Sequence, residues 1–170
     1  MKRIIPVLAT LSISFLCYAG GNPEHVIFPE GYKSEFTQYD VRNRANGKQV
    51  AVLYANETAI NSAKAGQLAD GSKIIMEVYK AKLDENGDKI KNASGLLEKG
   101  KFAAVAVMEK NSNWDSSFSA EDRAGNWGFA IYKTNGTPKD NNLDCATCHK
   151  PMPENDYMFS FQSLTKFTQE

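Results

Sequence analysis

The chain has 170 residues, a length that suits one domain with a hydrophobic core and is short for two. Hydrophobic residues make up 42% of it and charged residues 24%, and the basic and acidic residues balance to a formal net charge of zero. This composition is ordinary for a globular protein, and it gives no support for nucleic-acid binding because there is neither a basic excess nor a charged tail.

The N-terminal segment has the pattern of a secretory signal peptide. It starts with positive charge, residues 4–18 are almost wholly apolar or small and carry no acid, and Ala19 offers a small residue for cleavage. The apolar stretch is too short for a good membrane span. We therefore expect residues 1–19 to be removed and residues 20–170 to form one exported, periplasmic domain without a membrane span. A retained anchor and lipidation at Cys17 are the alternatives.

The first part of the mature chain contains a turn, a short strand and a helix. Phe28-Pro29-Glu30-Gly31-Tyr32 is typical of a turn that leads into the fold, and residues 49–54 form an apolar run with β-propensity. Asn56 has the character of a helix N-cap, and Gly66 that of a helix end. Apolar residues between them recur at helical spacing, so the sequence predicts a helix over residues 57–65.

Alternating residues dominate the middle of the chain. Residues 73–82 predict a strand with Ile74, Met76 and Val78 on one face. The remaining predicted elements are a hairpin turn at 84–88, strands at 101–110 and 127–133, and polar loops at 111–126 and 134–144. Together these elements predict an α+β fold, mainly an antiparallel sheet of about four or five strands with a few short helices.

The segment Cys145-Ala146-Thr147-Cys148-His149 is the most specific motif of the chain. A Cys-x-x-Cys-His pattern is typical of c-type haem attachment. Two thiols at this spacing can both reach vinyl groups on one porphyrin edge and form thioethers, and the next residue then presents its imidazole to the iron. We predict one covalent haem c, bonded through Cys145 and Cys148, with His149 as an axial ligand of the iron.

The same residues allow other interpretations. A zinc site needs four ligands, and a histidine directly after Cys148 is awkward for one tetrahedron. A thioredoxin-like pair usually begins a helix after a central strand, whereas Cys145 follows a long polar loop. A structural disulfide accounts for both cysteines and leaves His149 unexplained. Export also favours haem, because c-type maturation takes place outside the cytoplasm.

The second axial position of the iron is either filled by another side chain or open. A methionine there raises the reduction potential and suits electron transfer, whereas an open face suits gas binding. His25 lies in the polar N-terminal segment, and Met152 is too close to His149 in sequence to cross easily to the opposite face. Met76 and Met108 lie in predicted strands and could approach that face.

Five segments carry a resemblance to a known family. They are Phe28–Tyr32, Tyr54–Glu77, Gly125–Phe129, Cys145–His149 and Asp156–Phe159. Over about residues 28–164 the chain resembles the cytochrome P-460 family, which includes the cytochromes c′-beta. The resemblance implies a cytochrome P-460-like domain that is largely antiparallel β, is often a homodimer and, in the better-known branches, holds a five-coordinate haem.

One departure from the family pattern concerns a lysine. The catalytic branch oxidises hydroxylamine and joins a lysine covalently to the porphyrin. Aligning Asp70-Gly71 and Glu77 with that pattern puts Met76 at the lysine position. Lys73 is three residues away, so strand alternation points it to the opposite face. The resemblance therefore implies a member without the cross-linking lysine, which argues against hydroxylamine oxidation as the main activity.

Two functions of different classes follow. In the first, the protein is an electron carrier whose iron is ligated by His149 and Met76, and it exchanges electrons with a redox partner protein. In the second, it is a gas binder like the cytochromes c′-beta, whose iron is open to nitric oxide. Phe36, Phe102 and Phe129 are candidate caps over the open face in that case.

A third and weaker hypothesis is an enzyme. A peroxidase-like or hydroxylamine-oxidising protein would need an acid–base group, for which Glu109 and Asp115 are candidates. Carboxylates of this kind are usually solvated at the surface, so the carrier and the gas binder are favoured.

Overall fold

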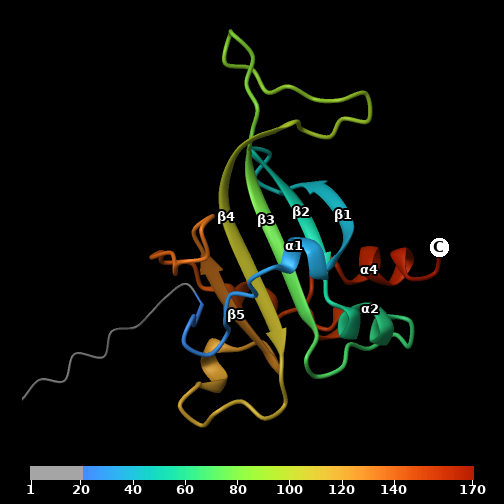
Figure 1. The fold of residues 1–170 in the computed structure, drawn as a ribbon, viewed down its shortest axis with the longest axis vertical. Coiled ribbons are helices and arrows are strands. Elements are labelled where there is room, and N and C mark those ends of the chain that lie inside the picture. The colour runs from blue at the N-terminus through green and yellow to red at the C-terminus, as the bar shows by residue number, and fades with distance from the viewer. Residues whose placement is uncertain (1–20) are drawn as a thin grey trace, which may run out of the picture.

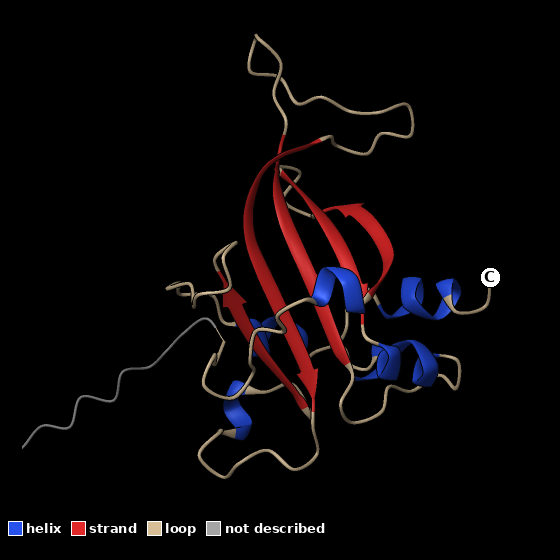
Figure 2. Cartoon of the chain, viewed as in Figure 1, coloured by secondary structure: helices blue, strands red, loops and turns tan. Residues whose placement is uncertain are grey.

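A five-stranded antiparallel sheet forms the centre of the molecule, with its strands in the order β1-β2-β3-β4-β5 (Figures 1 and 2). The computed structural model describes residues 21–170, so the expected signal peptide at residues 1–19 lies outside the described residues. A few short helices complete the fold, which confirms the α+β class. No helix in residues 21–170 is long and apolar enough to cross a membrane.

The elements follow one another in simple order along the chain. The strands are β1 (Thr37–Asn43), β2 (Gln49–Ala55), β3 (Lys73–Ala81), β4 (Lys99–Lys110) and β5 (Trp127–Tyr132). The helices are α1 (Tyr32–Glu35), α2 (Glu57–Ala63), α3 (Cys145–His149) and α4 (Phe161–Phe167), with short 3₁₀ turns η1 (Ala120–Asp122) and η2 (Pro153–Asn155). Asn56 caps α2 as predicted, because its side chain accepts a hydrogen bond from the backbone N–H of Ala59 at 3.0 Å.

The two faces of the sheet pack against different parts of the chain. One face, called here the motif face, is covered by α2, α3 and α4. Its core residues are Tyr39, Leu53, Ala55, Ile74, Trp127 and Phe129 from the strands, with Ala59, Ala63, Ala146 and Leu164 from the helices. The other, called the tyrosine face, packs Ile75, Val105, Val107, Ala130 and Tyr132 against Val26, Tyr32 and Phe118. In Figure 1, α1 lies in front of the sheet on the tyrosine face, and Figure 2 shows α3 behind β4 and β5.

The register of β3 decides which residues face the motif. Ile74 and Met76 lie on the motif face, as the alternation predicted, and Ile75 between them lies on the tyrosine face. Met76 pairs with Leu53 on β2 and with Ala106 on β4.

A buried carboxylate anchors the tyrosine face. Glu77 is 1% exposed, and its oxygens accept hydrogen bonds from the hydroxyls of Tyr32 at 2.7 Å, Tyr79 at 2.9 Å and Tyr54 at 3.2 Å. The ammonium group of Lys33 lies 2.9 Å from the same carboxylate. Because Tyr32 and Lys33 belong to α1, the carboxylate ties this short helix to β3 on the side of the sheet away from the motif.

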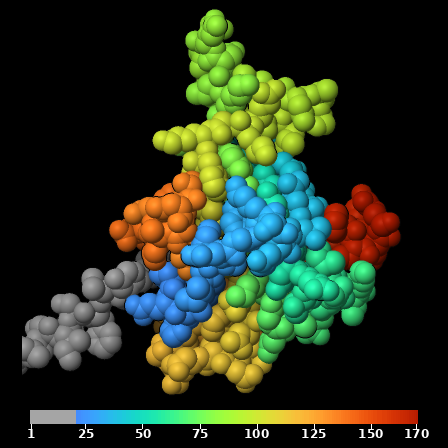
Figure 3. Space-filling model, viewed as in Figure 1, coloured from blue at the N-terminus to red at the C-terminus, as the bar shows by residue number. Residues whose placement is uncertain are grey.

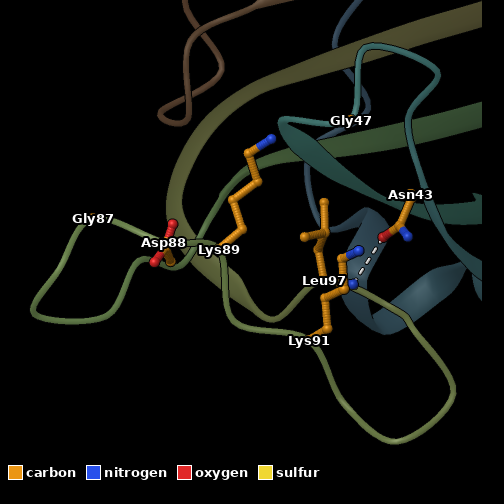
Figure 4. Close-up of a pocket in the computed structure, with 7 residues that line it drawn as sticks. All are labelled: Asn43, Gly47, Gly87, Asp88, Lys89, Lys91 and Leu97. Carbon is orange, nitrogen blue, oxygen red and sulfur yellow. Dashed lines mark hydrogen bonds between the residues drawn. The ribbon is translucent and has the colours of Figure 1, made fainter.

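Residues 82–98 project from the sheet as an arm between β3 and β4 (Figures 1 and 3). The predicted turn at 84–88 lies at its tip, where Gly87 has a φ of 85°. A groove of about 400 Å³ lies between the arm and the β1–β2 turn, and a hydrogen bond of 2.8 Å from Leu97 N–H to Asn43 crosses it (Figure 4). The groove is lined by Asn43, Gly47, Gly87, Asp88, Lys89, Lys91 and Leu97.

Candidate functional site

The Cys-x-x-Cys-His motif forms the short helix α3 directly after a long loop. Its first turn is capped by Asp144, whose carboxylate accepts a hydrogen bond from the backbone N–H of Thr147 at 2.9 Å. Cys148 lies three positions after Cys145, so both thiols leave the same helical turn. Ala146 faces the opposite way and is buried in the motif-face core, which fixes the helix on the sheet.

The two thiols have different surroundings. Cys145 is partly buried against the motif-face core, and burial, together with the nearby Asp144, raises the pKa of its thiol to about 11. Cys148 is exposed, and both cysteines are free. Within residues 21–170, no three His, Cys, Asp or Glu side chains come together to hold a metal ion.

His149 is held in one orientation by a hydrogen bond and two aromatic rings. Its Nδ1 lies 2.6 Å from the carbonyl oxygen of Tyr157. The ring centroid lies 4.6 Å from that of Phe129 on β5 and 4.9 Å from that of Phe159. Burial lowers the pKa of His149 and outweighs the hydrogen bond to Tyr157, which acts in the opposite direction.

The tautomer of His149 follows from this contact. A carbonyl oxygen only accepts, so Nδ1 carries the proton and Nε2 carries the lone pair. Within residues 21–170, Nε2 has no hydrogen-bond partner. A neutral histidine whose Nδ1–H is bound to a backbone carbonyl is the usual form of a metal ligand. One such imidazole beside two free thiols of the same turn is a donor set that fits a c-type haem.

The turn after the motif is unusual in its backbone. Asp156 and Tyr157 have φ values of 48° and 59°, in the left-handed region that residues with a Cβ rarely adopt. The Asp156 carboxylate accepts hydrogen bonds from the Lys110 ammonium at 2.8 Å, the Trp127 indole N–H at 3.2 Å and the Leu68 backbone N–H at 3.2 Å. The turn is therefore attached to the ends of β4 and β5.

Two segments of the sequence resemblance meet here. Gly125 and Trp127 come from the segment around the start of β5, and Asp156 and Tyr157 from the segment after the motif. Trp127 donates to Asp156, and a Cβ on Gly125 would lie 2.4 Å from Cε2 of Tyr157. The glycine therefore leaves the space that the Tyr157 ring occupies beside the axial-ligand candidate His149.

The methionines differ in their relation to the motif. Met76 and Met108 are both partly buried on the motif face. Met108 pairs directly with Phe129, which contacts the His149 ring, whereas Met76 lies one strand further and pairs with Ala106. Met158 is 1% exposed and belongs to the core.

Several residues considered from the sequence lie away from the motif. Lys73 forms an ion pair of 3.1 Å with Glu109 across β3 and β4, and both residues alternate with motif-face residues, so they point to the opposite side. Asp115 is exposed and accepts from Ser117 in its own loop. His25 stacks on a tyrosine-face ring. The structure does not bring any of these side chains to the motif.

The three candidate caps are also divided. Phe36 and Phe102 pack on the tyrosine face, the side of the sheet away from the motif. Phe129 contacts His149 itself and so lies on the side of the axial-ligand candidate. The interpretation of Phe36 and Phe102 as caps over an open haem face is therefore wrong, because the β-strand alternation and the position of α1 place them on the other side.

Sequence reasoning missed the residues that orient His149. In the sequence, Asp156 and Tyr157 are recognisable only as part of a segment that resembles the family. Lys110 is recognisable only as a residue of a predicted strand. The partners of Asp156 lie 46, 29 and 88 residues away along the chain, so no local pattern links them.

Comparison with known proteins gives one family. A family model described as Cytochrome P460 matches residues 29–160, which covers most of the chain from the turn before α1 to the residue before α4. Among curated proteins, none matches the sequence.

Proposed function

The chain belongs to the cytochrome P460 family, whose members are haem-binding cytochromes, and on that premise we propose that it is an exported, periplasmic monohaem c-type cytochrome that carries electrons. The observation that carries the proposal is the state of His149, a neutral imidazole with its Nδ1–H on the Tyr157 carbonyl and its Nε2 without a partner. Two free thiols of the same helical turn accompany it.

Each residue of the motif has a separate task in this proposal. Cys145 and Cys148 form the thioethers, which keep the cofactor at high effective concentration in the exported protein. His149 binds the iron through Nε2, and its contacts with Phe129 and Phe159 keep the ring from turning. When bound, the haem supplies one iron atom that changes between the ferric and ferrous states.

Met76 is the side chain that we assign to the second axial position. Met108 is paired with Phe129 and so belongs to the part of the motif face where the imidazole lies. Met76 is one strand further from β5, and its cross-strand neighbour Ala106 is too small to cover its thioether. A thioether ligand raises the reduction potential, which suits an electron carrier.

A gas binder with an open iron is the second candidate. It is favoured by a row of apolar residues that pair across β2 to β5 on the motif face, namely Leu53, Met76, Ala106 and Ile131. This row offers no polar group that could bind a larger polar ligand, which suits a small ligand such as nitric oxide. In this case Met76 is a packing residue. A homodimer, as the family resemblance implies, is compatible with either function.

The ferrous absorption spectrum tests the proposal. The full chain would be produced in a host that matures c-type cytochromes, and the spectrum recorded for wild type, Met76→Ala and Met108→Ala. Met108→Ala is the matched control because it removes a methionine from the same face of the neighbouring strand. We expect sharp low-spin bands in wild type and Met108→Ala, and their loss in Met76→Ala.

Other results would select another function. A broad high-spin Soret band in wild type that shifts on adding nitric oxide would replace the carrier by the gas binder. A far-red-shifted ferrous band would indicate a cross-linked haem of the enzyme branch and contradict the alignment of Met76. A colourless protein whose mass corresponds to residues 20–170 without a cofactor would overturn the haem proposal as a whole.

A further inference from the structure

The turn between η2 and α4 holds two left-handed residues in succession. Asp156 and Tyr157 are the only residues other than glycine with positive φ in residues 21–170. Side chains with a Cβ clash with the backbone in this region, so such residues persist only where their surroundings fix them. The turn closes on itself through the backbone, since Tyr157 N–H donates to the Met152 carbonyl at 2.8 Å.

The carboxylate of Asp156 attaches this closed turn to the sheet. Its ion pair with Lys110 is nearly shielded from solvent, with side chains 9% and 13% exposed for lysine and aspartate. The same ammonium group donates to the Leu68 carbonyl at 2.8 Å, and the Trp127 indole N–H supplies a further hydrogen bond to the carboxylate. One side chain thus connects the turn to the segment before β3, the end of β4 and the start of β5.

The orientation of the Tyr157 carbonyl depends on this attachment. Trp127 and Phe129 lie on the same face of β5, two residues apart. Asp156 is bound to the first and His149 packs against the second. The Asp156 carboxylate therefore fixes the position of the turn relative to β5, which supports the His149 ring. The carbonyl oxygen of the next residue, Tyr157, lies 2.6 Å from Nδ1 of His149.

We propose that Asp156 is a positioning residue for the haem iron, which acts through the Tyr157 carbonyl on His149. The inference rests on the proposed function, in which His149 binds the iron. A hydrogen bond from Nδ1–H to a carbonyl raises the basicity of the imidazole, which stabilises the ferric over the ferrous state. Asp156 thereby lowers the reduction potential of the cytochrome through the hydrogen bond between His149 and the Tyr157 carbonyl.

The test is the midpoint potential of haem-loaded protein, measured by optical redox titration. Asp156→Gly removes the carboxylate but tolerates the left-handed backbone, so it separates attachment from strain. Asp156→Asn keeps one acceptor oxygen and loses the ion pair. Asp88→Asn in the arm is the matched control, because Asp88 is exposed and its side chain has no hydrogen-bond or ion-pair partner in residues 21–170.

We expect the potential of Asp156→Gly to rise, with a change of at least tenfold in the ferric–ferrous equilibrium, or about 59 mV for a one-electron couple. Asp156→Asn should shift it less in the same direction, and Asp88→Asn not at all. If Asp156→Gly does not fold, Trp127→Phe decides, since it removes the indole donor to Asp156 while keeping an aromatic ring in the core, and it should still raise the potential.

Three negative results are distinguishable. A haem-loaded Asp156→Gly protein with the wild-type potential would overturn the positioning role while leaving the haem proposal intact. An unfolded Asp156→Gly together with an unshifted Trp127→Phe would overturn the positioning role as well. A wild-type chain that takes up no haem would instead overturn the proposed function on which the inference rests.

Discussion

Gly125 lies so close to the ring of Tyr157 that a Cβ at this position would be 2.4 Å from Cε2 and 2.9 Å from Cζ of the tyrosine. The contact joins the loop before β5 to the turn after the haem motif. The backbone carbonyl of Tyr157 accepts the hydrogen bond from His149. Because glycine at position 125 makes room for the Tyr157 ring, it also affects the orientation of the axial-ligand candidate.

Gly125→Ala should therefore disturb the site as well as the fold. The residue has a φ of 57°, which costs a residue with a Cβ roughly 1–2 kcal/mol, and the overlap with Tyr157 adds about 1–3 kcal/mol. We expect a lower urea midpoint with an unchanged slope, and an altered absorption spectrum of the haem-loaded protein. Gly66→Ala is the control, because its φ of 81° imposes the same kind of strain while no atom lies within 4 Å of the added Cβ. A variant of Gly125 that loses stability no more than this control would contradict the steric argument.

The two cysteines should contribute independently to covalent attachment. Cys145→Ala and Cys148→Ala each leave one thiol in the helical turn, so a fraction of each protein should retain haem through a single thioether, whereas the double variant should retain none. Mass spectrometry after denaturation measures this directly. Cys145→Ala should also lower stability more than Cys148→Ala, because Cys145 is partly buried against the core and Cys148 is exposed. Covalent haem in the double variant would exclude these thiols as the attachment points.

Lys73 provides a test of the β3 register. Its ion pair with Glu109 is partly exposed and lies on the side away from the motif. Lys73→Ala should change the free energy of unfolding by less than about 1 kcal/mol and leave the haem spectrum unchanged. Met76→Ala, three residues along the same strand, should alter the spectrum. An effect of Lys73→Ala on the haem bands would show that this lysine reaches the cofactor.

The parts of the fold with a strong local pattern could be predicted from the sequence. Alternation from Lys73 to Lys82 predicted both the strand observed as β3 (Lys73–Ala81) and the face of Met76, since neighbouring side chains of a pleated strand must point to opposite sides. Strand β1 was missed because only Tyr39 is buried along it, so no apolar alternation marks it. It is defined instead by pairing with β2 and by packing against α4.

Of the candidate site, only the Cys-x-x-Cys-His motif could be predicted from the sequence. Cys145, Cys148 and His149 are close together in sequence, and this spacing is itself the pattern typical of c-type haem attachment. The turn at Asp156 has no such signature, because its conformation depends on Lys110 and Trp127, which other strands supply. Long-range hydrogen bonds of this kind override local backbone preference, so they become visible only in the folded chain.

The buried carboxylate of Glu77 should make stability depend on pH in a specific direction. Burial raises the pKa of Glu77, but hydrogen bonds from Tyr32, Lys33 and Tyr79 outweigh it, so the pKa is lowered overall. Its contribution is therefore present above the pKa of the unfolded chain, about 4.3, and is lost as the pH falls through the folded value. Glu77→Gln should cost roughly 2 kcal/mol at neutral pH, as expected for hydrogen bonds to a charged group.

Urea denaturation at several pH values between neutral and about 3 would check this, since the group titrates within that window. The difference in unfolding free energy between wild type and Glu77→Gln should narrow as the pH falls. Glu98→Gln is the matched control, because Glu98 forms an ion pair with Lys82 at 3.1 Å that is largely exposed. A constant difference across the range would contradict the assignment of the lowered pKa.

The hydroxyls of the tyrosines around Glu77 should ionise only at unusually high pH. Burial, and after it the charge of Glu77, raises the pKa of Tyr54 to about 12, and Tyr32 and Tyr79 shift in the same direction. A raised folded pKa means that the stability is fully present below about 10, the value in the unfolded chain, and is lost as the pH rises further. Ultraviolet titration of tyrosinate should show these groups ionising last.

Glu77→Gln separates the two causes of the raised tyrosine pKa values, because it removes the carboxylate charge and leaves the tyrosines buried. The late-ionising tyrosines should then titrate at lower pH, while Tyr132, which donates to the Val26 carbonyl and not to Glu77, should keep its raised pKa. Tyr132→Phe identifies the component of the titration curve that belongs to this residue. If the curve of Glu77→Gln coincided with that of wild type, burial alone would account for the shifts, and the carboxylate would have no electrostatic influence on its three tyrosine partners.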